Sequence, residues 1–438
     1  MGSARTGGVG RVHPAWAVAV VTLFALLAAS AFRSSTGALL QPLETDFGWS
    51  RTVTSGAASL NLVIYGLSAP FAAAVMETWG VRRTVVTSLM VVGAASAASC
   101  FMTSAWQLWL LWGVVIGLGS GSMALTFGTI VANRWFSARR DIVVGCFSAA
   151  SAAGQILFVP AIAWLAHTSG GWRAAMWLVA AVSIACALSV LVCLRDRPRD
   201  MGVRPLGIAD DAPLEAMELT PARVGNPLAL GLGAFTRNRR SGTLWALMLT
   251  FAVCGWTTNG IIQTHFIPAA HDHSMPATVA ANMIGLIGIF DVLGTILAGW
   301  LTDRYDPRIL LAVFYTFRGV SLLFVDQLLG PDMNPGLWFF IIFVGLDWTA
   351  TVPPTVALCR EAFGLEESGV VFGWVYAAHM VGAGVGAQVS GVLRQQHEGY
   401  FIAWELSAAL CFFAAGIAAT IRRHRTVGPG TLIATPMV

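Results

Sequence analysis

The sequence predicts an all-α membrane protein with twelve transmembrane helices arranged in two pseudo-symmetric six-helix halves. Three observations support this fold class: few residues are charged, the apolar residues gather in long runs, and one half of the chain echoes the other. Only 11% of the 438 residues are charged and 56% are hydrophobic. A soluble domain has roughly 25% charged residues, so this deficit is typical of a chain whose outer surface faces lipid.

Twelve runs are apolar and long enough to cross a bilayer, which takes about 20 residues of helix. They lie near 15–40, 52–76, 84–103, 106–131, 141–166, 173–194, 243–268, 278–301, 308–328, 336–359, 369–393 and 400–421. The first run is too long for a signal-peptide core, so we interpret it as a membrane helix.

A polar, non-periodic stretch at residues 195–242 separates the sixth run from the seventh. We expect this stretch to be a linker between an N-terminal half, 1–194, and a C-terminal half, 243–438, which ends in a short tail.

Arginine placement predicts the orientation. All 26 basic residues are arginine, and 21 of them fall on one side if the N-terminus is placed in the cytoplasm. Only Arg51, Arg173 and Arg394 then fall outside. Because cytoplasmic loops retain positive charge, we expect both termini in the cytoplasm of a bacterium and the helices in its inner membrane.

Composition also excludes several function classes. The chain has no lysine, so it lacks the lysine of a phosphate-binding Walker loop. Its seven cysteines show no CxxC spacing, and no nucleophile–base set or metal spacing appears. We therefore expect no enzyme activity and no cofactor. The net charge of +4 follows membrane topology and does not indicate nucleic acid; the expected partners of a monomeric chain are lipid, protons and a small-molecule substrate.

The two halves repeat each other at matching positions. Residues 299–308 read GWLTDRYDPR, and residues 73–82, 226 positions earlier, read AAVMETWGVR. The fifth and eleventh runs also match, at an offset of 228, so that Gly154 pairs with Gly382 and Ser151 with His379. Repeated halves around a central site are typical of secondary transporters.

The stretch at 299–308 resembles the GxLxDRxxxR loop signature of the major facilitator superfamily, and the copy at 73–83 is a degenerate version of it. The resemblance implies a transporter in which this loop latches helix ends in the outward-facing state. The implied gate residues are Asp303, Arg304 and Arg308, and in the degenerate copy Glu77, Arg82 and Arg83.

A narrower resemblance concerns the monocarboxylate transporters and the oxalate/formate exchangers. Residues 135–145, WFSARRDIVVG, resemble the entry to their fifth helix, and residues 37–50 resemble the exit of their first. Residues 197–202, RPRDMG, resemble the segment that follows the sixth helix in the exchangers. The resemblance implies this broad branch and no particular substrate.

Glycines four residues apart form two stripes that predict close helix packing. The stripes are Gly113, Gly117 and Gly121 in the fourth run and Gly382 and Gly386 in the eleventh. In the tenth run, Pro353 and Pro354 remove backbone hydrogen bonds and predict a kink.

Ionisable groups in the middle of a membrane helix cost about 2.5–3.5 kcal/mol even on the lenient insertion scale. Asp291 and Arg318 flank the loop between the eighth and ninth runs almost symmetrically, so we expect them to form a structural ion pair. The monocarboxylate transporters also have an Asp in their eighth helix, followed four residues later by a substrate-binding Arg. Thr295 stands at that position here.

His379 is the leading candidate for the substrate site, because a histidine changes charge near physiological pH. It lies near the middle of the eleventh run, where the exchangers have a substrate-facing Lys, and we expect it to bind substrate and carry the coupling proton. Asp347 is a second proton carrier or else is locked to a neighbour. Arg33 in the first run is expected to bind a carboxylate or to extend to the outer headgroups.

Five further residues are expected to line the cavity: Trp348, Phe127 and, in the seventh run, Asn259, Gln263 and His265. Trp348 resembles a cavity tryptophan of the exchangers. The whole pattern favours a secondary transporter of a small organic anion, such as a carboxylate, coupled to protons or working by exchange. The alternatives are a proton-antiport exporter of drugs or hydrophobic metabolites, which would use Asp347, and a membrane sensor that does not transport.

Overall fold

The computed structural model describes residues 13–123, 126–137, 140–166, 168, 170–208, 227–331 and 335–421. Its N-terminal half crosses the membrane six times. The crossings are α1 (Pro14–Phe47), α2 (Arg51–Trp79), α3 (Val81–Ser99), a segmented fourth crossing, α7 (Arg140–Ala166) and α8 (Gly171–Cys193). The fourth crossing consists of α4 (Ala105–Leu108), the π-helix η1 (Trp109–Ile116), α5 (Gly117–Gly121) and α6 (Thr126–Trp135).

The C-terminal half follows the same plan. Its seventh crossing consists of α10 (Gly242–Gly255), the π-helix η4 (Trp256–Ile262) and α11 (Gln263–Asp272). The remaining elements are α12 (Ala277–Thr302), α13 (Pro307–Leu328), α14 (Pro335–Asp347), α15 (Val352–His397) and α16 (Phe401–Thr420). Within the described residues, eight helices are long and apolar enough to span a bilayer by themselves. The predicted all-α fold with twelve crossings is confirmed.

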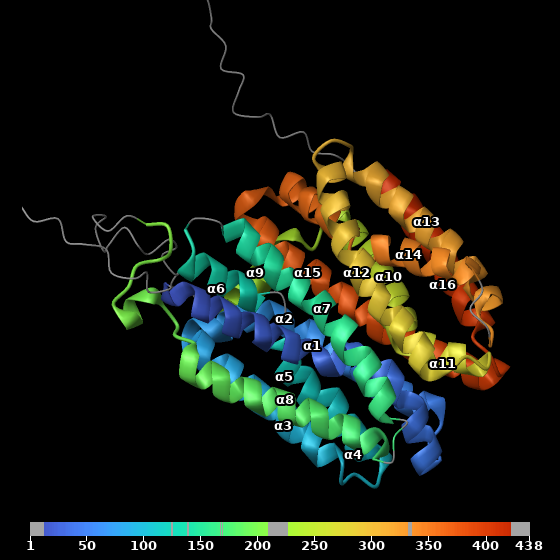
Figure 1. Ribbon diagram of the computed structural model, residues 1–438. Coiled ribbons are helices and arrows are strands. Elements are labelled where there is room, and N and C mark those ends of the chain that lie inside the picture. The colour runs from blue at the N-terminus through green and yellow to red at the C-terminus, as the bar shows by residue number, and fades with distance from the viewer. Residues whose placement is uncertain are drawn as a thin grey trace, which may run out of the picture.

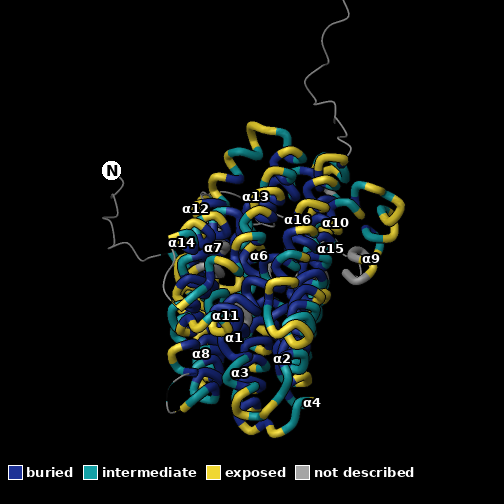
Figure 2. The backbone as a smooth tube through the Cα atoms, turned by 90° about the vertical axis from the view of Figure 1, so that its right-hand side faces the viewer, coloured by how far each residue is buried: buried dark blue, intermediate teal, exposed yellow. Residues whose placement is uncertain are grey.

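Each half is a bundle, and the halves lie side by side (Figure 1). In the N-terminal half α1 packs on α7 and α3 on α8, and in the C-terminal half α10 packs on α15 and α13 on α16. The halves meet where α2 packs on α15 and α7 on α12. Exposed residues lie along the outer helices as well as in the loops (Figure 2), and many of them are large and apolar, such as Phe101, Ile296 and Phe339. This is the burial pattern of a multi-pass membrane protein.

The two ends of the bundle differ in charge. The end that we call the arginine-rich end carries the turns at 80–83 and 303–308, the segment 194–208, and the last turn of α16. The end that we call the opposite end carries the turns at 48–50, 273–276 and 398–400.

The segment between the halves contains a helix that the sequence did not predict. α9 (Pro227–Asn238) lies inside the stretch interpreted as a non-periodic linker. Its Arg237 forms an ion pair of 2.8 Å with Glu367 of α15, and Asn238 donates a hydrogen bond of 2.9 Å to the same carboxylate. This part of the expected linker is therefore helical, because α9 is held by contacts with the C-terminal half that its own composition does not reveal. Residues 209–226 lie outside the described residues.

The tenth crossing is broken twice. It starts as α14, is interrupted by a turn at 348–351 before Pro353 and Pro354, and resumes as the first part of α15. The sequence predicted a kink at the prolines. The second break is at Gly364, whose φ of 74° and ψ of 167° join the tenth crossing to the eleventh without a separate loop. Only glycine adopts such a conformation readily.

The glycine stripes lie where the sequence predicted close packing. A methyl group added at Gly382 would lie 2.1 Å from the carbonyl oxygen of Ala252, and one added at Gly121 would lie 2.0 Å from the hydroxyl of Ser68. The helix backbones therefore approach each other in a way that only glycine permits.

Candidate functional site

Arg318 is the centre of a buried polar cluster in the C-terminal half. It projects from α13, and its Nε donates a hydrogen bond of 2.6 Å to Oδ2 of Asp347 at the end of α14. A second guanidinium nitrogen donates to the backbone carbonyl of Asp347, at 2.5 Å. The third donates to the Cys254 sulfur at 3.1 Å and to the Thr257 hydroxyl at 3.3 Å.

This arrangement corrects one sequence-based expectation. Arg318 was expected to pair with Asp291, and in the described structure its carboxylate partner is Asp347. Asp291 and Arg318 lie near the middle of α12 and α13, but the turn that follows α14 brings the Asp347 side chain and backbone carbonyl to the guanidinium of Arg318. Two roles were considered for Asp347, a proton carrier and a carboxylate locked to a neighbour. The ion pair with Arg318 corresponds to the second role.

Asp291 on α12 has a different environment at the broken turn of the tenth crossing. Its Oδ1 accepts hydrogen bonds from the backbone N–H and the hydroxyl of Thr349, at 3.1 and 2.5 Å. The Thr295 hydroxyl donates to the same oxygen at 3.4 Å. Because α14 has ended, the N–H of Thr349 is free of helical bonding, and the carboxylate of Asp291 satisfies it.

His379 joins the seventh and eleventh crossings. It lies on α15 with 7% of its surface exposed. Its Nδ1 is 3.2 Å from the carbonyl oxygen of Phe251, and its Nε2 is 3.2 Å from Oδ1 of Asn259. The rings of Phe251 and Tyr376 flank the imidazole. One ring nitrogen therefore faces a backbone carbonyl oxygen and the other the amide oxygen of Asn259.

The polar residues of the seventh crossing lie on or beside the π-helix η4. Asn259 is half-buried and also accepts a hydrogen bond from the Thr258 hydroxyl at 3.3 Å. Gln263 is 5% exposed. π-helical turns are frequent at functional sites, so the asparagine that meets His379 has a local geometry typical of a site.

Two predicted aromatic residues lie in packed surroundings. Trp348 is 9% exposed within the core of the C-terminal half, and Phe127 is fully buried in the core of the N-terminal half. Neither residue is part of the lining of the cavity between α12, α13 and α14. The side chains of Arg33 and Glu77 lie outside the described residues, so the structure places only their backbone, in α1 and α2.

The residues assigned to a gate tie helix ends together within each half. The guanidinium of Arg82 donates to the Leu191 carbonyl of α8 at 2.9 Å, and its backbone N–H donates to Asp196 at 2.7 Å. Arg308, its counterpart in the repeat, pairs with Asp306 at 2.7 Å and donates to the carbonyl of Ile421 at 3.1 Å. Each arginine thus holds the last turn of the sixth helix of its own half.

The other gate residues are at the surface of the arginine-rich end. Arg304 stacks over the Trp300 ring at 4.1 Å and donates to the Trp300 carbonyl at 3.2 Å. Asp303 and Arg83 are exposed. The hydrogen bonds and the ion pair of Arg304 and Arg308 lie inside the C-terminal half, so within the described part of the chain these residues do not join the halves.

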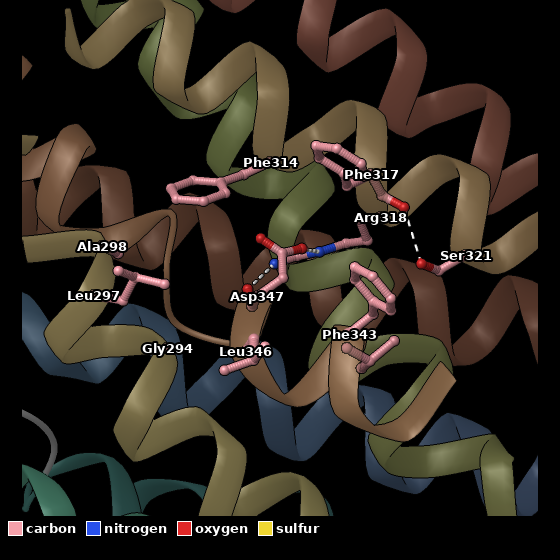
Figure 3. A pocket seen from close by; sticks show the side chains of 11 residues that line it. Gly294, Leu297, Ala298, Phe314, Phe317, Arg318, Ser321, Phe343, Leu346 and Asp347 are labelled. Carbon is pink, nitrogen blue, oxygen red and sulfur yellow. Dashed lines mark hydrogen bonds and ion pairs between the residues drawn. The ribbon is translucent and has the colours of Figure 1, made fainter. Parts of the chain in front are cut away.

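The cavity in Figure 3 has a volume of about 170 Å³ and lies between α12, α13 and α14. Arg318 and Asp347 form its polar floor, and the rest of the lining is mostly apolar. Leu297, Phe317 and Phe343 on its rim are about half exposed on the outside of the bundle. The cavity therefore faces lipid and is separate from the interface between the halves.

Sequence reasoning missed a polar bridge at the opposite end. Arg51 of α2 forms an ion pair of 2.5 Å with Glu44 of α1 and donates a hydrogen bond of 2.5 Å to the hydroxyl of Tyr400. His265 of α11 lies 3.0 Å from the same hydroxyl. The spacing of Glu44 and Arg51 across a short turn was a visible signal, but nothing in the sequence indicates Tyr400 as a partner.

Comparison with known proteins assigns the sequence to a family. The family model of the Major Facilitator Superfamily matches residues 22–387 and, in a second match, 258–432. The chain belongs to the major facilitator superfamily. This membership confirms the family indicated by the loop at 299–308, and members of the family are transporters rather than enzymes.

Relatives and solved structures agree with this assignment. An uncharacterized MFS-type transporter of Bacillus subtilis is 22% identical over 93% of this chain and 94% of its own length. Monocarboxylate transporter 11 of Mus musculus is 30% identical over 66% of this chain and 60% of its own length. The fold matches the nucleoside transporter NupG with a TM-score of 0.71 at 14% identity, covering 93% of this chain and 100% of NupG.

Proposed function

We propose that this chain is a secondary transporter of small organic anions, with monocarboxylates as the main substrate class, and that it works by alternating access. The observation that carries the proposal is its similarity to several monocarboxylate transporters, which extends over 83% of this chain for monocarboxylate transporter 13 of Bos taurus. The repeated halves and the broken tenth crossing support it, because discontinuous helices are typical of transporter sites.

His379 is the residue that we assign to proton coupling and substrate binding. It lies deep in the membrane, at the contact of two crossings that pack against each other. A proton gained by the ring adds a positive charge at the site and attracts an anion. Asp347 is a poorer carrier, because a proton on its carboxylate would remove the negative charge that is paired with the buried Arg318. We propose Arg33 as the fixed positive charge of the site.

The orientation expected from the arginines belongs to this proposal. We infer that the arginine-rich end lies in the cytoplasm of a bacterial cell, since the predicted topology assigns 21 of the 26 arginines to that side. A cysteine placed at the exposed Glu398 of the opposite end would then react with an impermeant thiol reagent added outside intact cells. If the cysteine reacts only after lysis, the opposite end lies in the cytoplasm and the inferred orientation is wrong.

The function is tested by flux into proteoliposomes. The panel is lactate, pyruvate, formate and oxalate together with hydrophobic cationic amphiphiles, each with and without a pH gradient. Uptake of a carboxylate that is accelerated by an inward proton gradient supports a symporter, and carboxylate–carboxylate counterflow supports an exchanger. Transport of the amphiphiles alone would overturn the proposal and favour the exporter.

The role of His379 is tested in the same vesicles. The His379→Ala variant is expected to flatten the pH dependence of carboxylate flux, whereas Arg33→Ala weakens carboxylate binding at every pH. His397→Ala is the matched control, because His397 is exposed at the opposite end. A wild-type pH profile in His379→Ala would remove the histidine from the coupling mechanism.

A further inference from the structure

The two halves are in close contact at the opposite end of the bundle. A methyl group added at Gly37 of α1 would lie 2.6 Å from the backbone oxygen of Gln263 in α11, so these helices touch backbone to backbone. A methyl group added at Gly391 of α15 would lie 2.1 Å from the Ser55 hydroxyl in α2. No substrate passes between helices at these separations, so this end is closed.

A continuous chain of hydrogen bonds crosses the contact. The guanidinium of Arg51, from the N-terminal half, donates to the Tyr400 hydroxyl oxygen at 2.5 Å. The Tyr400 hydroxyl in turn lies 3.0 Å from Nδ1 of His265, and Nε2 of His265 lies 2.7 Å from the carbonyl oxygen of Ala387. Tyr400 and His265 are fully buried, and Arg51 is 7% exposed.

The chain has one consistent set of proton positions. The Ala387 carbonyl can only accept, so Nε2 of His265 carries its proton and Nδ1 accepts. The Tyr400 hydroxyl then donates to Nδ1, which leaves its oxygen to accept from Arg51. Every group in the bridge is satisfied with a neutral imidazole, and a buried network that is fully satisfied favours one arrangement.

Only one of these bonds joins the two halves. The ion pair of Arg51 with Glu44 lies within the N-terminal half, at 2.5 and 2.7 Å. The bonds of His265 with Tyr400 and Ala387 lie within the C-terminal half. When the halves part, the charge of Arg51 therefore keeps its carboxylate partner, and within this bridge the separation breaks one bond, the one between Arg51 and Tyr400. Exposed contacts of Thr52 with Gln395 and of Gln41 with His271 also cross between the halves at this end.

We propose that Arg51, Tyr400 and His265 form a latch that holds the opposite end closed and releases when the transporter opens to that side. The latch rests on the proposed alternating-access function. Its strength is that of one hydrogen bond to a charged group, which favours the closed state by roughly tenfold to a hundredfold. A contact of this strength biases the equilibrium without blocking the cycle.

The test uses the full-length protein with spin labels at opposite sides of the contact. Thr45→Cys at the exposed end of α1 and Gln396→Cys at the exposed end of α15 carry the labels, and the exposed Cys146 and Cys193 are replaced by serine. Tyr400→Phe removes only the hydroxyl that accepts from Arg51. Tyr315→Phe is the matched control, because this buried tyrosine donates to the Thr250 carbonyl within one half, at 2.7 Å.

The latch predicts that Tyr400→Phe raises the fraction of long label–label distances roughly tenfold or more, and that Tyr315→Phe leaves it at the parent value. Where the open fraction is too small for distance measurement, hydrogen exchange of the backbone at 264–270 reads the same opening and should accelerate by the same factor. Unchanged distances and exchange in Tyr400→Phe, or an equal change in Tyr315→Phe, would overturn the latch. A failure to transport any carboxylate would remove the proposed substrate and leave these distances unaffected.

Discussion

Arg318 is a charge in the middle of the membrane that the protein surrounds with acceptors. Asp347 supplies a carboxylate oxygen and a backbone carbonyl, while Cys254 and Thr257 take the remaining nitrogen. A buried charge is tolerated only when it is paired and hydrogen-bonded. The same pair fastens α13 to the end of α14, next to the turn at which the tenth crossing is interrupted.

Removal of either partner of this pair leaves the other as an unpaired buried charge. Arg318→Gln and Asp347→Asn are each expected to destabilise the protein by about 3–5 kcal/mol. The double variant should be less destabilised than the sum of the two singles, because the energies of paired residues do not add. Unfolding of the purified protein in detergent measures all three changes.

Asp291→Asn is the comparison for that series. Asp291 accepts from Thr349 and Thr295 rather than from Arg318, so its energy should add independently to that of Arg318→Gln. A coupling between Asp291 and Arg318 as large as that between Asp347 and Arg318 would contradict the pairing described above.

Sequence reasoning found the depth of these charged residues but not the direction in which they point. Counting along the chain at ~1.5 Å per residue predicts that Asp291 and Arg318 lie at a similar depth, and the structure has them near the middle of α12 and α13. The choice between two carboxylates depends on the rotation of each helix about its axis and on the turn after α14. Neither is encoded in spacing alone, which is why Arg318 was assigned the wrong partner.

At the scale of the helices, packing is set by where the backbones touch. Gly382 on α15 lies against the carbonyl of Ala252 on α10, and Gly386 on the same face meets Trp256. The four-residue spacing of these glycines is visible in the sequence, so this packing face could be predicted. The identity of the partner helix could not be predicted, because the spacing of the glycines does not indicate which helix packs against them.

Gly382→Ala tests that packing. The added methyl group would lie 2.1 Å from a backbone oxygen, which must move, so a loss of about 1–3 kcal/mol is expected from overpacking. Gly416→Ala on α16 is the matched control, because nothing lies within 4 Å of its added methyl group. That substitution should stabilise its helix by about 1 kcal/mol. The midpoint temperature of thermal unfolding should fall in Gly382→Ala and rise in Gly416→Ala. Equal shifts in the two variants would contradict the packing.

At the scale of the whole molecule, the arginine-rich end differs from the closed end. Arg82 and Arg308 occupy matching repeat positions and hold the last turns of α8 and α16, each within its own half. The repeat seen in the sequence is therefore a repeat of contacts as well. The loop signature predicted gate residues at this end from the sequence, whereas the bridge at the opposite end has no signature and became visible only in three dimensions.

Asp303 is the gate residue that we expect to act when this end closes. It is exposed in this structure, and the resemblance implies that it latches helix ends in the other state. Asp303→Asn should slow carboxylate exchange by roughly tenfold or more, since one charge-assisted hydrogen bond is lost, with little change in the dissociation constant. Flux and binding assays on the same preparation separate the two effects.

Glu398→Gln controls for the loss of a surface carboxylate, because Glu398 is exposed at the opposite end. It should transport at the parent rate. A normal rate in Asp303→Asn, or an equal slowing in both variants, would remove Asp303 from the gate.

The junction at Gly364 has a mechanical consequence. One glycine, rather than a flexible loop, joins the tenth crossing to the eleventh. A tilt of the eleventh helix is therefore expected to move residues 352–363, the part of the tenth crossing next to Gly364. The turn at 348–351 is the nearest interruption of the helix, so a backbone change there can accommodate this movement. Thr349 in this turn bonds to Asp291, and Asp347 just before it bonds to Arg318. Displacement of the eleventh helix is therefore expected to change the hydrogen bonds of both carboxylates.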